Sequence, residues 1–382
     1  MKKTILYVLY MVAFPLLLAA SNPSQDIVVP FEFKGHHLTV QVKINDASES
    51  FTFLVDTGGL TFIDKKVAAK LKLKQKGPMA KINVLHLGDR QIEKVFCLTT
   101  FNFDLLQRYG YRIHGIIGSN LMERYRVTFD YATRQITFTH DASPLKAKEG
   151  EYLTSFSNHP INNAPIIALS VNGNTIESMV DTGQPYALVF PMDDYKGYAA
   201  AGLNGCIQSQ GLMVKWPLTR PEYNILARVK ELAVDTRAYK NVPCLFAELP
   251  PMLAMPLLGN ALLEHYTVTI DYPRDKILLA PREDVTLADN VFSFGLGINI
   301  HDQKDVFIEG VWSQSPADAA GLQPGERVVA FNGKAAGGDS IGELQKLLRD
   351  DSVTTIVLQV AAEEGTRQVT LEKARLFGAA AE

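Results

Sequence analysis

The stretch that decides the fold is Val55-Asp56-Thr57-Gly58, which returns later in the chain as Val180-Asp181-Thr182-Gly183. Residues 51–55 and 176–180, which lead into the two copies, have patterns typical of β-strands. Glycine at the end of each triplet permits a tight backbone turn that other residues resist. The sequence therefore predicts that each aspartate lies where a strand ends and the chain turns.

A second motif follows each triplet and extends the duplication. Gly115-Ile-Ile-Gly118 is echoed by Pro256-Leu-Leu-Gly259, and residues 118–131 share eight identities in register with residues 259–272. The copies are separated by 125 residues at the triplets and by 141 residues at the second motif, which is too long for a solenoid repeat. The pattern indicates two tandem copies of one small domain.

Each copy is predicted to be mostly β. Residues 38–44 and 167–171 alternate apolar and polar side chains, as half-buried strands do. Asn172-Gly173 is a strong signal for a hairpin turn, and a short helix is expected over 121–125. The other elements expected are hairpins over 127–138 and 268–279 and a linker over 141–150.

Two aspartates held close together have a chemistry that neither has alone. They cannot both ionise readily, so one pKa rises and the pair shares a proton. The ionised member can take a proton from a water, and the protonated member can hydrogen-bond the carbonyl under attack. Amide hydrolysis then needs neither a covalent intermediate nor a metal.

These motifs resemble those of the aspartic proteases of the retropepsin/pepsin superfamily, in the bacterial single-chain, two-lobe form. The resemblance covers residues 28–282 and implies a mostly β fold. The fold would consist of two tandem retropepsin-like (acid protease) β-barrel lobes, 25–145 and 150–282, related by a pseudo-twofold axis. It implies that Asp56 and Asp181 are catalytic. The active-site loops would be supported by Thr57, Gly58, Thr182, Gly183, Gly118 and Gly259.

The residue after each triplet departs from the family's pattern. The family often has Ala or Ser there, whereas this chain has Gly59 in one copy and Gln184, followed by Pro185, in the other. A larger polar side chain beside the aspartates could change substrate fit or proton sharing. The segments that would close over a substrate are expected within 74–87 and 205–223.

The C-terminal part of the chain is a different module. Phe294-Gly-Leu-Gly-Ile298 and the run 315–333 together resemble a PDZ domain, an α+β fold, of the kind attached to exported bacterial proteases, over 289–376. Ser340-Ile-Gly-Glu343 predicts a capping box for a helix that ends near Arg349. The resemblance implies that a peptide's terminal carboxylate meets backbone N–H groups of Gly295, Leu296, Gly297 and Ile298. A groove used only for internal packing remains the alternative.

Composition excludes several classes of protein. Apolar residues make up 47% of the chain and charged residues 21%, which excludes disorder of the whole chain. With 38 basic and 41 acidic residues there is no basic excess, so no nucleic-acid partner is expected. The histidines show no metal-ligand spacing, and neither a metal nor a cofactor is expected. Because one chain holds both triplets, we expect a monomer.

The N-terminal twenty residues form a separate segment, 1–20. Lys2 and Lys3 precede an apolar run, 5–20, and polar residues follow, which is the order of a secretory signal peptide. An uncleaved anchor is the competing interpretation. We therefore expect an exported, periplasmic protein. If the signal is not cleaved, we expect the protein to be anchored in the membrane and to face the periplasm.

Three cysteines leave the redox state open. One disulfide is possible, and so is none, because buried cysteines also act as small apolar residues. The cysteines are Cys97, Cys206 and Cys244.

Two hypotheses for the function follow. The first is an exported aspartic endopeptidase in which Asp56 and Asp181 activate a water and the PDZ domain recruits the C-termini of polypeptide substrates or partners. The second is a non-catalytic exported peptide-binding protein with a degenerate protease fold, and its motivation is Gln184-Pro185.

Overall fold

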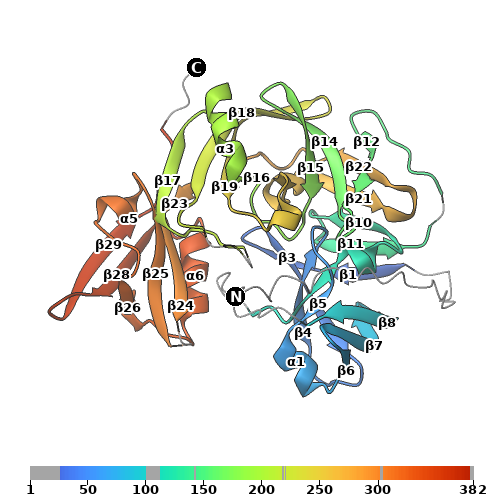
Figure 1. Cartoon of the computed structure of the whole chain (residues 1–382), viewed down its shortest axis with the longest axis horizontal. Helices are drawn as coiled ribbons and strands as arrows, with labels where there is room; N and C mark the ends of the chain where they lie inside the picture. Colours follow the sequence, from blue (N-terminus) through green and yellow to red (C-terminus); the bar gives the residue numbers. More distant parts are fainter. Residues whose placement is uncertain are drawn as a thin grey trace, which may run out of the picture.

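The computed structural model describes residues 26–99, 112–141, 143–216, 219, 221–301 and 304–378. The predicted signal segment 1–20 lies outside these residues. Strands dominate the architecture, and the C-terminal module (residues 292–375) lies at one side of the molecule (Figure 1). Within the described ranges no helix has the length and apolar character that a membrane span requires.

The two sequence repeats each form a sheet, and the order of strands is the same in both. The first repeat (residues 27–139) has the order β2 (Glu32–Lys34), β3 (His37–Ile44), β4 (Phe51–Asp56), β9 (Gly115–Gly118), β5 (Phe62–Ile63), β8 (Arg90–Leu98), β7 (Met79–Leu87), β6 (Lys74–Lys76). The second repeat (residues 152–281) has the order β13 (Ser157–Asn158), β14 (Pro165–Val171), β15 (Asn174–Val180), β20 (Leu257–Leu258), β16 (Leu188–Pro191), β19 (Arg237–Ala247), β18 (Ile225–Val234), β17 (Cys206–Gly211). Each sheet has one additional strand pairing, β3 with β7 in the first repeat and β14 with β18 in the second. This pairing curls each sheet so that strands far apart in its order meet.

Strands β4 and β15 carry the two triplets to the middle of these sheets. The alternation predicted for β14 is present, and in β3 it holds from Val40 to Ile44, whereas the residues before Val40 are all buried. The inward side chains of both strands join one core that extends over both repeats. At the hairpin between β14 and β15, Asn172 and Gly173 have positive φ values of 50° and 80°, as the turn signal requires. Pairing of β4 with β9, and of β15 with β20, is parallel and sets each second motif beside its triplet.

A third sheet joins the repeats. Its order is β1 (Ile27–Pro30), β11 (Gln135–Thr139), β10 (Arg126–Asp130), β21 (Tyr266–Asp271), β22 (Lys276–Pro281), β12 (Tyr152–Ser155). At its centre, equivalent residues of the two repeats face each other, since Thr128 pairs with Thr269 and their hydroxyl oxygens are 3.0 Å apart. The hairpins expected over 127–138 and 268–279 form, and the pairing of β10 with β21 joins them.

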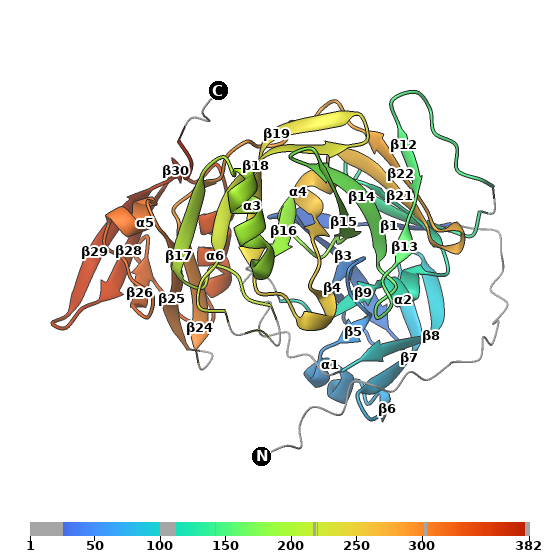
Figure 2. The same ribbon diagram turned by 45° about the horizontal axis from the view of Figure 1, so that its top comes forward.

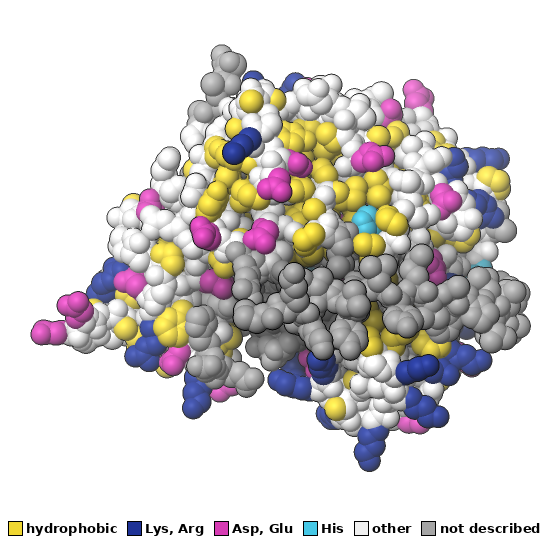
Figure 3. Space-filling view, in the orientation of Figure 1, with side chains coloured by type: hydrophobic (Ala, Val, Ile, Leu, Met, Phe, Trp, Pro, Cys, Tyr) yellow, Lys and Arg dark blue, Asp and Glu magenta, His cyan; other side chains and the backbone are white. Residues whose placement is uncertain are grey.

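The helices of the repeats are short. They are α1 (Lys65–Lys70), α2 (Ser119–Met122), α3 (Tyr195–Ala201), α4 (Asn260–Leu263) and the single turns η2 (Met192–Asp194), η3 (Pro251–Leu253) and η4 (Tyr272–Arg274). The helix expected over 121–125 is α2, which begins two residues earlier, directly after Gly118. On the face shown in Figure 3, hydrophobic side chains gather over the strands of the second repeat, and Lys and Arg gather around α1 and β6–β8.

The C-terminal module consists of strands with two helices against them. Its elements are β23 (Phe292–Ser293), β24 (Leu296–His301), β25 (Asp305–Trp312), α5 (Pro316–Ala319), β26 (Arg327–Phe331), β27 (Lys334–Ala335), α6 (Ile341–Arg349), β28 (Thr355–Ala361), β29 (Thr366–Glu372) and β30 (Ala374–Arg375). Helix α6 ends as expected, but the predicted capping box is wrong. The Ser340 hydroxyl does not cap α6; it donates to Ala335 O and accepts from Gly337 N, because the preceding turn holds it.

Strand β17 connects the second repeat to the C-terminal module. It pairs with β18 on one side and with β25 on the other, so one continuous sheet runs between them (Figure 2). A shared apolar cluster includes Ile207 and Leu226 from the repeat and Trp312 and Phe377 from the C-terminal part. Arg228 lies over the Phe377 ring at 4.8 Å. The C-terminal module is thus packed firmly against the second repeat.

Candidate active site

The two triplets, which are 125 residues apart in the sequence, meet at one place. Their carboxyl groups lie close together, since each packs against the triplet glycine of the opposite loop and each shifts the pKa of the other. Each carboxylate also accepts the N–H of its own glycine, with Gly58 N 2.8 Å from Asp56 Oδ1 and Gly183 N 2.9 Å from Asp181 Oδ1. The structure therefore brings together the two aspartates that the sequence predicted as a pair.

The threonines of the triplets hold the two loops together. The Thr57 hydroxyl donates to Val180 O at 2.6 Å, and the Thr182 hydroxyl donates to Val55 O at 2.9 Å. Each hydroxyl also accepts the backbone N–H of the opposite threonine at 3.0 Å. Both threonines are fully buried. These four bonds fix the strand ends that carry the aspartates.

The triplet glycines are required by close approach. A Cβ on Gly58 would lie 2.5 Å from Cγ of Asp181, and one on Gly183 would lie 2.5 Å from Cγ of Asp56. The glycines of the second motif pack just as tightly, because a Cβ on Gly118 or Gly259 would lie within 2.3 Å of the backbone that follows the adjacent triplet. The absence of a side chain at these positions lets the two loops meet.

Burial raises the pKa of both carboxyl groups. Burial raises the pKa of Asp56, while hydrogen bonds from Asp181 and from the Gly58 and Gly59 amides offset part of the rise. Burial raises the pKa of Asp181 well above its ordinary value, and the charge and hydrogen bond of Asp56 raise it further. The two buried carboxyl groups therefore share one proton, because they cannot both ionise readily side by side.

Two polar residues that were not predicted from the sequence support the triplet loops through buried hydrogen bonds. Asn260 is fully buried and donates to Thr182 O at 2.6 Å and to His36 O at 2.8 Å, while it accepts from the Tyr131 hydroxyl at 2.7 Å. The equivalent residue of the first repeat is Ser119, whose hydroxyl contacts the backbone oxygen of Asn162. A signal was present, since these are the first residues after Gly118 and Gly259 in the aligned repeats.

Gln184 does not project between the aspartates. Its side chain is buried, and its Oε1 accepts the Tyr186 N–H at 3.2 Å within its own loop. Its backbone N–H lowers the pKa of Asp181, as the Gly59 N–H does for Asp56. The departure from the family's pattern thus preserves the backbone contact to each carboxylate.

The segments expected to close over a substrate differ between the repeats. In the first repeat, β6 and β7 form a hairpin whose turn contains Gly77. In the second repeat, the equivalent strand β17 is bonded to β25, and Leu212 N donates to Glu309 O at 2.8 Å. The structure therefore ties the segment after β17, which lies within the β17–β18 hairpin, to the C-terminal module.

Residues 295–298 begin the strand that lies against α6. Gly295 N donates to the Ser293 hydroxyl at 3.0 Å, and Leu296, Gly297 and Ile298 are the first residues of β24. Helix α6 packs on this strand. The predicted peptide-binding residues thus lie at the start of a strand flanked by a helix.

Other titratable residues have structural positions. All three cysteines are free, with Cys97 and Cys244 buried and Cys206 exposed. Asp130 accepts the N–H groups of the turn that follows it, whereas the fully buried Asp271 is bonded to Arg126 at 2.8 Å. No group of three or more His, Cys, Asp or Glu side chains is arranged to hold a metal within the part of the chain that the structure describes.

Comparison with known proteins identifies one domain. The PDZ domain family matches residues 307–360, so the C-terminal module is a PDZ domain. No curated protein matches the chain. Among solved structures, the crystal structure of basic 7S globulin from soybean is similar at a TM-score of 0.40 and 11% identity, over 68% of this chain and 95% of that one. A likeness at this level supports no conclusion about function.

Proposed function

We propose that this protein is an aspartic endopeptidase of the retropepsin/pepsin type, with two lobes related by a pseudo-twofold axis and a C-terminal PDZ domain that recruits polypeptide C-termini. The observation that carries the proposal is the contact between Asp56 and Asp181, each at the end of an equivalent strand and braced by the opposite threonine. The equal strand order of the two repeats supports the two-lobe interpretation.

The chemistry divides the work between the two carboxyl groups. One carboxyl group of the Asp56/Asp181 pair is ionised and takes a proton from a water, whose oxygen attacks the peptide carbonyl carbon. The other carboxyl group carries the shared proton and transfers it to the carbonyl oxygen as negative charge develops there, which gives a gem-diol intermediate. As the C–N bond then breaks, the first carboxyl group gives its proton to the leaving amine nitrogen, and one hydroxyl of the gem-diol returns a proton to the second carboxyl group. Activity is expected only between the two macroscopic pKa values of the pair, because below them the base is protonated and above them the acid is ionised.

The site is built from one chain, and the proposal includes a monomer without a cofactor. We also propose export to the periplasm, with residues 1–20 as a cleaved signal or an uncleaved anchor that faces the periplasm; this rests on the sequence pattern alone.

Cleavage of a mixed peptide library, from acid to neutral pH, tests the proposal. The wild-type protein is compared with the Asp56→Asn variant, whose side chain keeps its size and loses its charge. We expect cleavage by the wild type only. If the folded wild type cleaves no peptide at any pH, the proposal fails, and the second hypothesis, a non-catalytic peptide-binding protein, replaces it.

A further inference from the structure

The first repeat carries a dense cluster of basic residues. Residues 65–94 hold nine of the 38 Lys and Arg residues of the chain and two of its 41 acidic residues, and the rest of the chain has ten more acidic than basic residues. Figure 3 shows Lys and Arg gathered over α1 and β6–β8, and both ribbon views place α1 and β6 at the lower end of the molecule (Figure 1, Figure 2). Positive charge is therefore concentrated at one end of a chain that is otherwise acidic.

The exposed lysines of α1 and of the segment after it form the lysine face. They are Lys65, Lys66, Lys70, Lys72, Lys74 and Lys76. Lys70 pairs with Glu49 at 2.7 Å, whereas within the described part of the chain no carboxylate pairs with Lys72, Lys74 or Lys76. The fold therefore gains no stability from ion pairs of these three lysines.

Several of the basic residues lower the stability of the local structure. Lys74 of β6 stands directly opposite Lys81 of β7, and like charges in that position repel each other. Lys72 and Lys94 have positive φ values of 50° and 55°, in the region that favours Gly and Asn. Local departures of this kind collect at functional sites. A binding partner explains these lysines, and folding does not.

The β6–β7 turn presents an apolar side chain beside the lysines. Met79 is 36% exposed and stands opposite Lys76 in the hairpin. The turn is fixed, because Pro78 O accepts the Thr99 N–H at 2.8 Å and the Thr99 hydroxyl at 3.1 Å. An acidic polypeptide needs only the charges, whereas the interface of an anionic bilayer accepts both lysines and an inserted apolar side chain. The combination therefore favours a membrane as the partner.

The strands of this region also pack against the beginning of the described chain. A Cβ on Gly88, in the turn between β7 and β8, would lie 2.5 Å from Val28 O of β1. The proposed signal or anchor, residues 1–20, precedes this strand in the sequence. Such a segment brings the chain to a membrane, and stable attachment takes a second contact, which a basic surface can supply.

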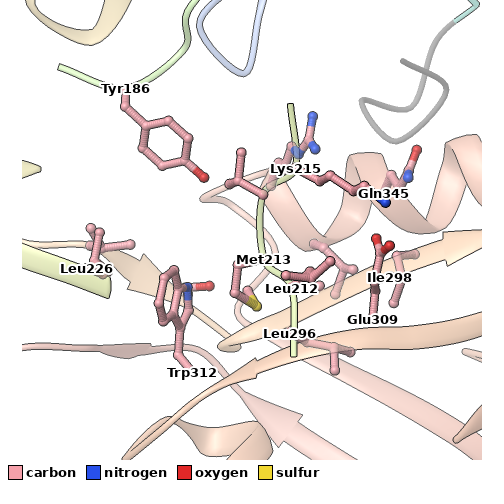
Figure 4. Close-up of a pocket in the computed structure, with 16 residues that line it drawn as sticks. Tyr186, Leu212, Met213, Lys215, Leu226, Leu296, Ile298, Glu309, Trp312 and Gln345 are labelled. Atoms are coloured by element: carbon pink, nitrogen blue, oxygen red, sulfur yellow. The ribbon is translucent and has the colours of Figure 1, made fainter. Parts of the chain in front are cut away.

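The pocket between the second repeat and the PDZ domain is a separate feature. It has a volume of about 190 Å³, and Figure 4 shows Met213 of the second repeat and Gln345 of α6 among the side chains that line it. None of the residues 65–94 lines this pocket. The lysine face therefore does not belong to the groove of the PDZ domain.

We propose that the lysine face and Met79 form a docking surface for a bilayer that contains anionic phospholipids. The lysines bind the headgroup phosphates, Met79 enters the interface, and the acidic remainder of the chain is directed away from the membrane. The inference goes beyond the proposed function and depends neither on catalysis nor on a ligand of the PDZ domain.

Cosedimentation of the full chain with vesicles tests this assignment. One set of vesicles is pure phosphatidylcholine, and the other is an equal mixture of phosphatidylcholine and phosphatidylglycerol. Binding to the neutral set measures what the apolar run 5–20 contributes, and the excess on the anionic set measures the lysine face. We expect a clear excess at low salt that falls as salt is added, because ions screen exposed charges.

A charge reversal locates the contact. Lys74→Glu should lower the excess by about tenfold or more, since it removes one attraction and adds one repulsion. It should also raise the melting temperature, because Lys81 then faces an opposite charge. Lys196→Glu, an equal change at an exposed position of α3, is the control and should keep the excess within about twofold.

A second pair of variants tests the apolar contribution. Met79→Ser removes the apolar side chain without a change in charge, and it should lower the excess about fivefold. The matched control is Ile161→Ser in the second repeat, where the side chain is 49% exposed and should not matter.

The named outcomes either support the docking surface or overturn it. A folded chain without an excess on anionic vesicles, or equal losses in Lys74→Glu and Lys196→Glu, overturns it. Fluorescein-labelled polyglutamate is the probe for the other partner: if it binds and Lys74→Glu weakens that binding, while Met79→Ser leaves the vesicle excess unchanged, the partner is an acidic polypeptide and the membrane assignment fails. The expected losses in a wild type that cleaves no peptide would leave this inference standing and remove only the protease.

Discussion

Thr57 and Thr182 each hydrogen-bond the other's backbone N–H at 3.0 Å, and each donates its hydroxyl to the strand that carries the other. The two loops therefore cannot shift independently. Since the aspartates precede these threonines directly, the reciprocal bonds set the spacing of the two carboxyl groups. A change in either threonine should consequently affect stability and the proposed hydrolysis together.

Replacing Thr182 by Val removes the hydroxyl and keeps the shape. The Thr57 N–H and the Val55 carbonyl are then left buried without a partner, at a cost of about 2 kcal/mol in the free energy of unfolding. The rate of peptide hydrolysis should fall together with the free energy of unfolding. Urea unfolding and peptide hydrolysis measure the two effects. Thr182→Ser is the control, and it should keep most of both; equal losses in Ser and Val would show that the hydroxyl is not the cause.

Gly183→Ala tests the close approach of the triplets. The added methyl group would lie 2.5 Å from Cγ of Asp56, so the carboxylate must move. A displacement of this size at reacting groups lowers the hydrolysis rate by about a hundredfold. The matched control is Gly197→Ala, within helix α3, where nothing lies within 4 Å of the new methyl.

Gly197→Ala should keep full activity and gain about 0.5–1 kcal/mol of stability, since alanine is the better helix former. Undiminished hydrolysis in Gly183→Ala would show that the two loops are farther apart in solution than in the structure.

The raised pKa of Asp181 predicts how stability depends on pH. In the folded chain burial favours the protonated form, so the cost of ionising it appears as pH rises above the ordinary value of 3.8. Asp181→Asn removes that cost, and it should raise the melting temperature at neutral pH. The gain corresponds to about 1.4 kcal/mol for each unit by which the pKa is raised.

This gain should shrink as pH falls and disappear below the pKa of the unfolded chain. Thermal melts of the wild type and of Asp181→Asn, recorded from acid to neutral pH, check it. A difference between the two that stays constant with pH would mean that the carboxyl group is not protonated preferentially in the folded state.

Asp271 is a buried charge at the junction of the repeats. Its Oδ2 lies 2.8 Å from Nη2 of Arg126 across the shared sheet, and Arg274 lies 3.2 Å away. Asp271→Asn removes the buried negative charge that faces the Arg126 guanidinium. We expect a loss of about 3–5 kcal/mol in the free energy of unfolding.

The control for this variant is Asp305→Asn, which breaks the exposed pair with Arg327 and should cost less than about 1 kcal/mol. Denaturant unfolding of both variants compares them. Similar small losses would indicate that water solvates Arg126 in solution.

The local pattern predicted much of the framework. Because Asp, Thr and Gly recur after similar strands, the sequence alone indicated that Asp56 and Asp181 act as a pair, and the structure places them in contact. The alternation in β3 and β14 likewise predicted their buried faces. Strand ends and buried faces depend on residues that are close together in the sequence, so the spacing of apolar residues predicts them.

Features that depend on distant contacts were not predictable in this way. Asn260 is one polar residue after a glycine, and only the fold brings Thr182, His36 and Tyr131 around it. Ser340 has the spacing of a capping residue, yet the turn at Gly337 takes its hydroxyl. The contact of Met213 with the PDZ sheet depends on a paired strand from another module, which no local signal encodes.

The most direct test of the central claim is the hydrolysis rate of one cleavable peptide with the wild type, Asp56→Asn, Asp181→Asn and the double variant. If the two aspartates act as one unit, each single variant should lose as much activity as the double variant, because removing either carboxyl group disables the pair. Activity that persists in a folded Asp181→Asn protein, or losses that add between the two sites, would contradict the shared dyad.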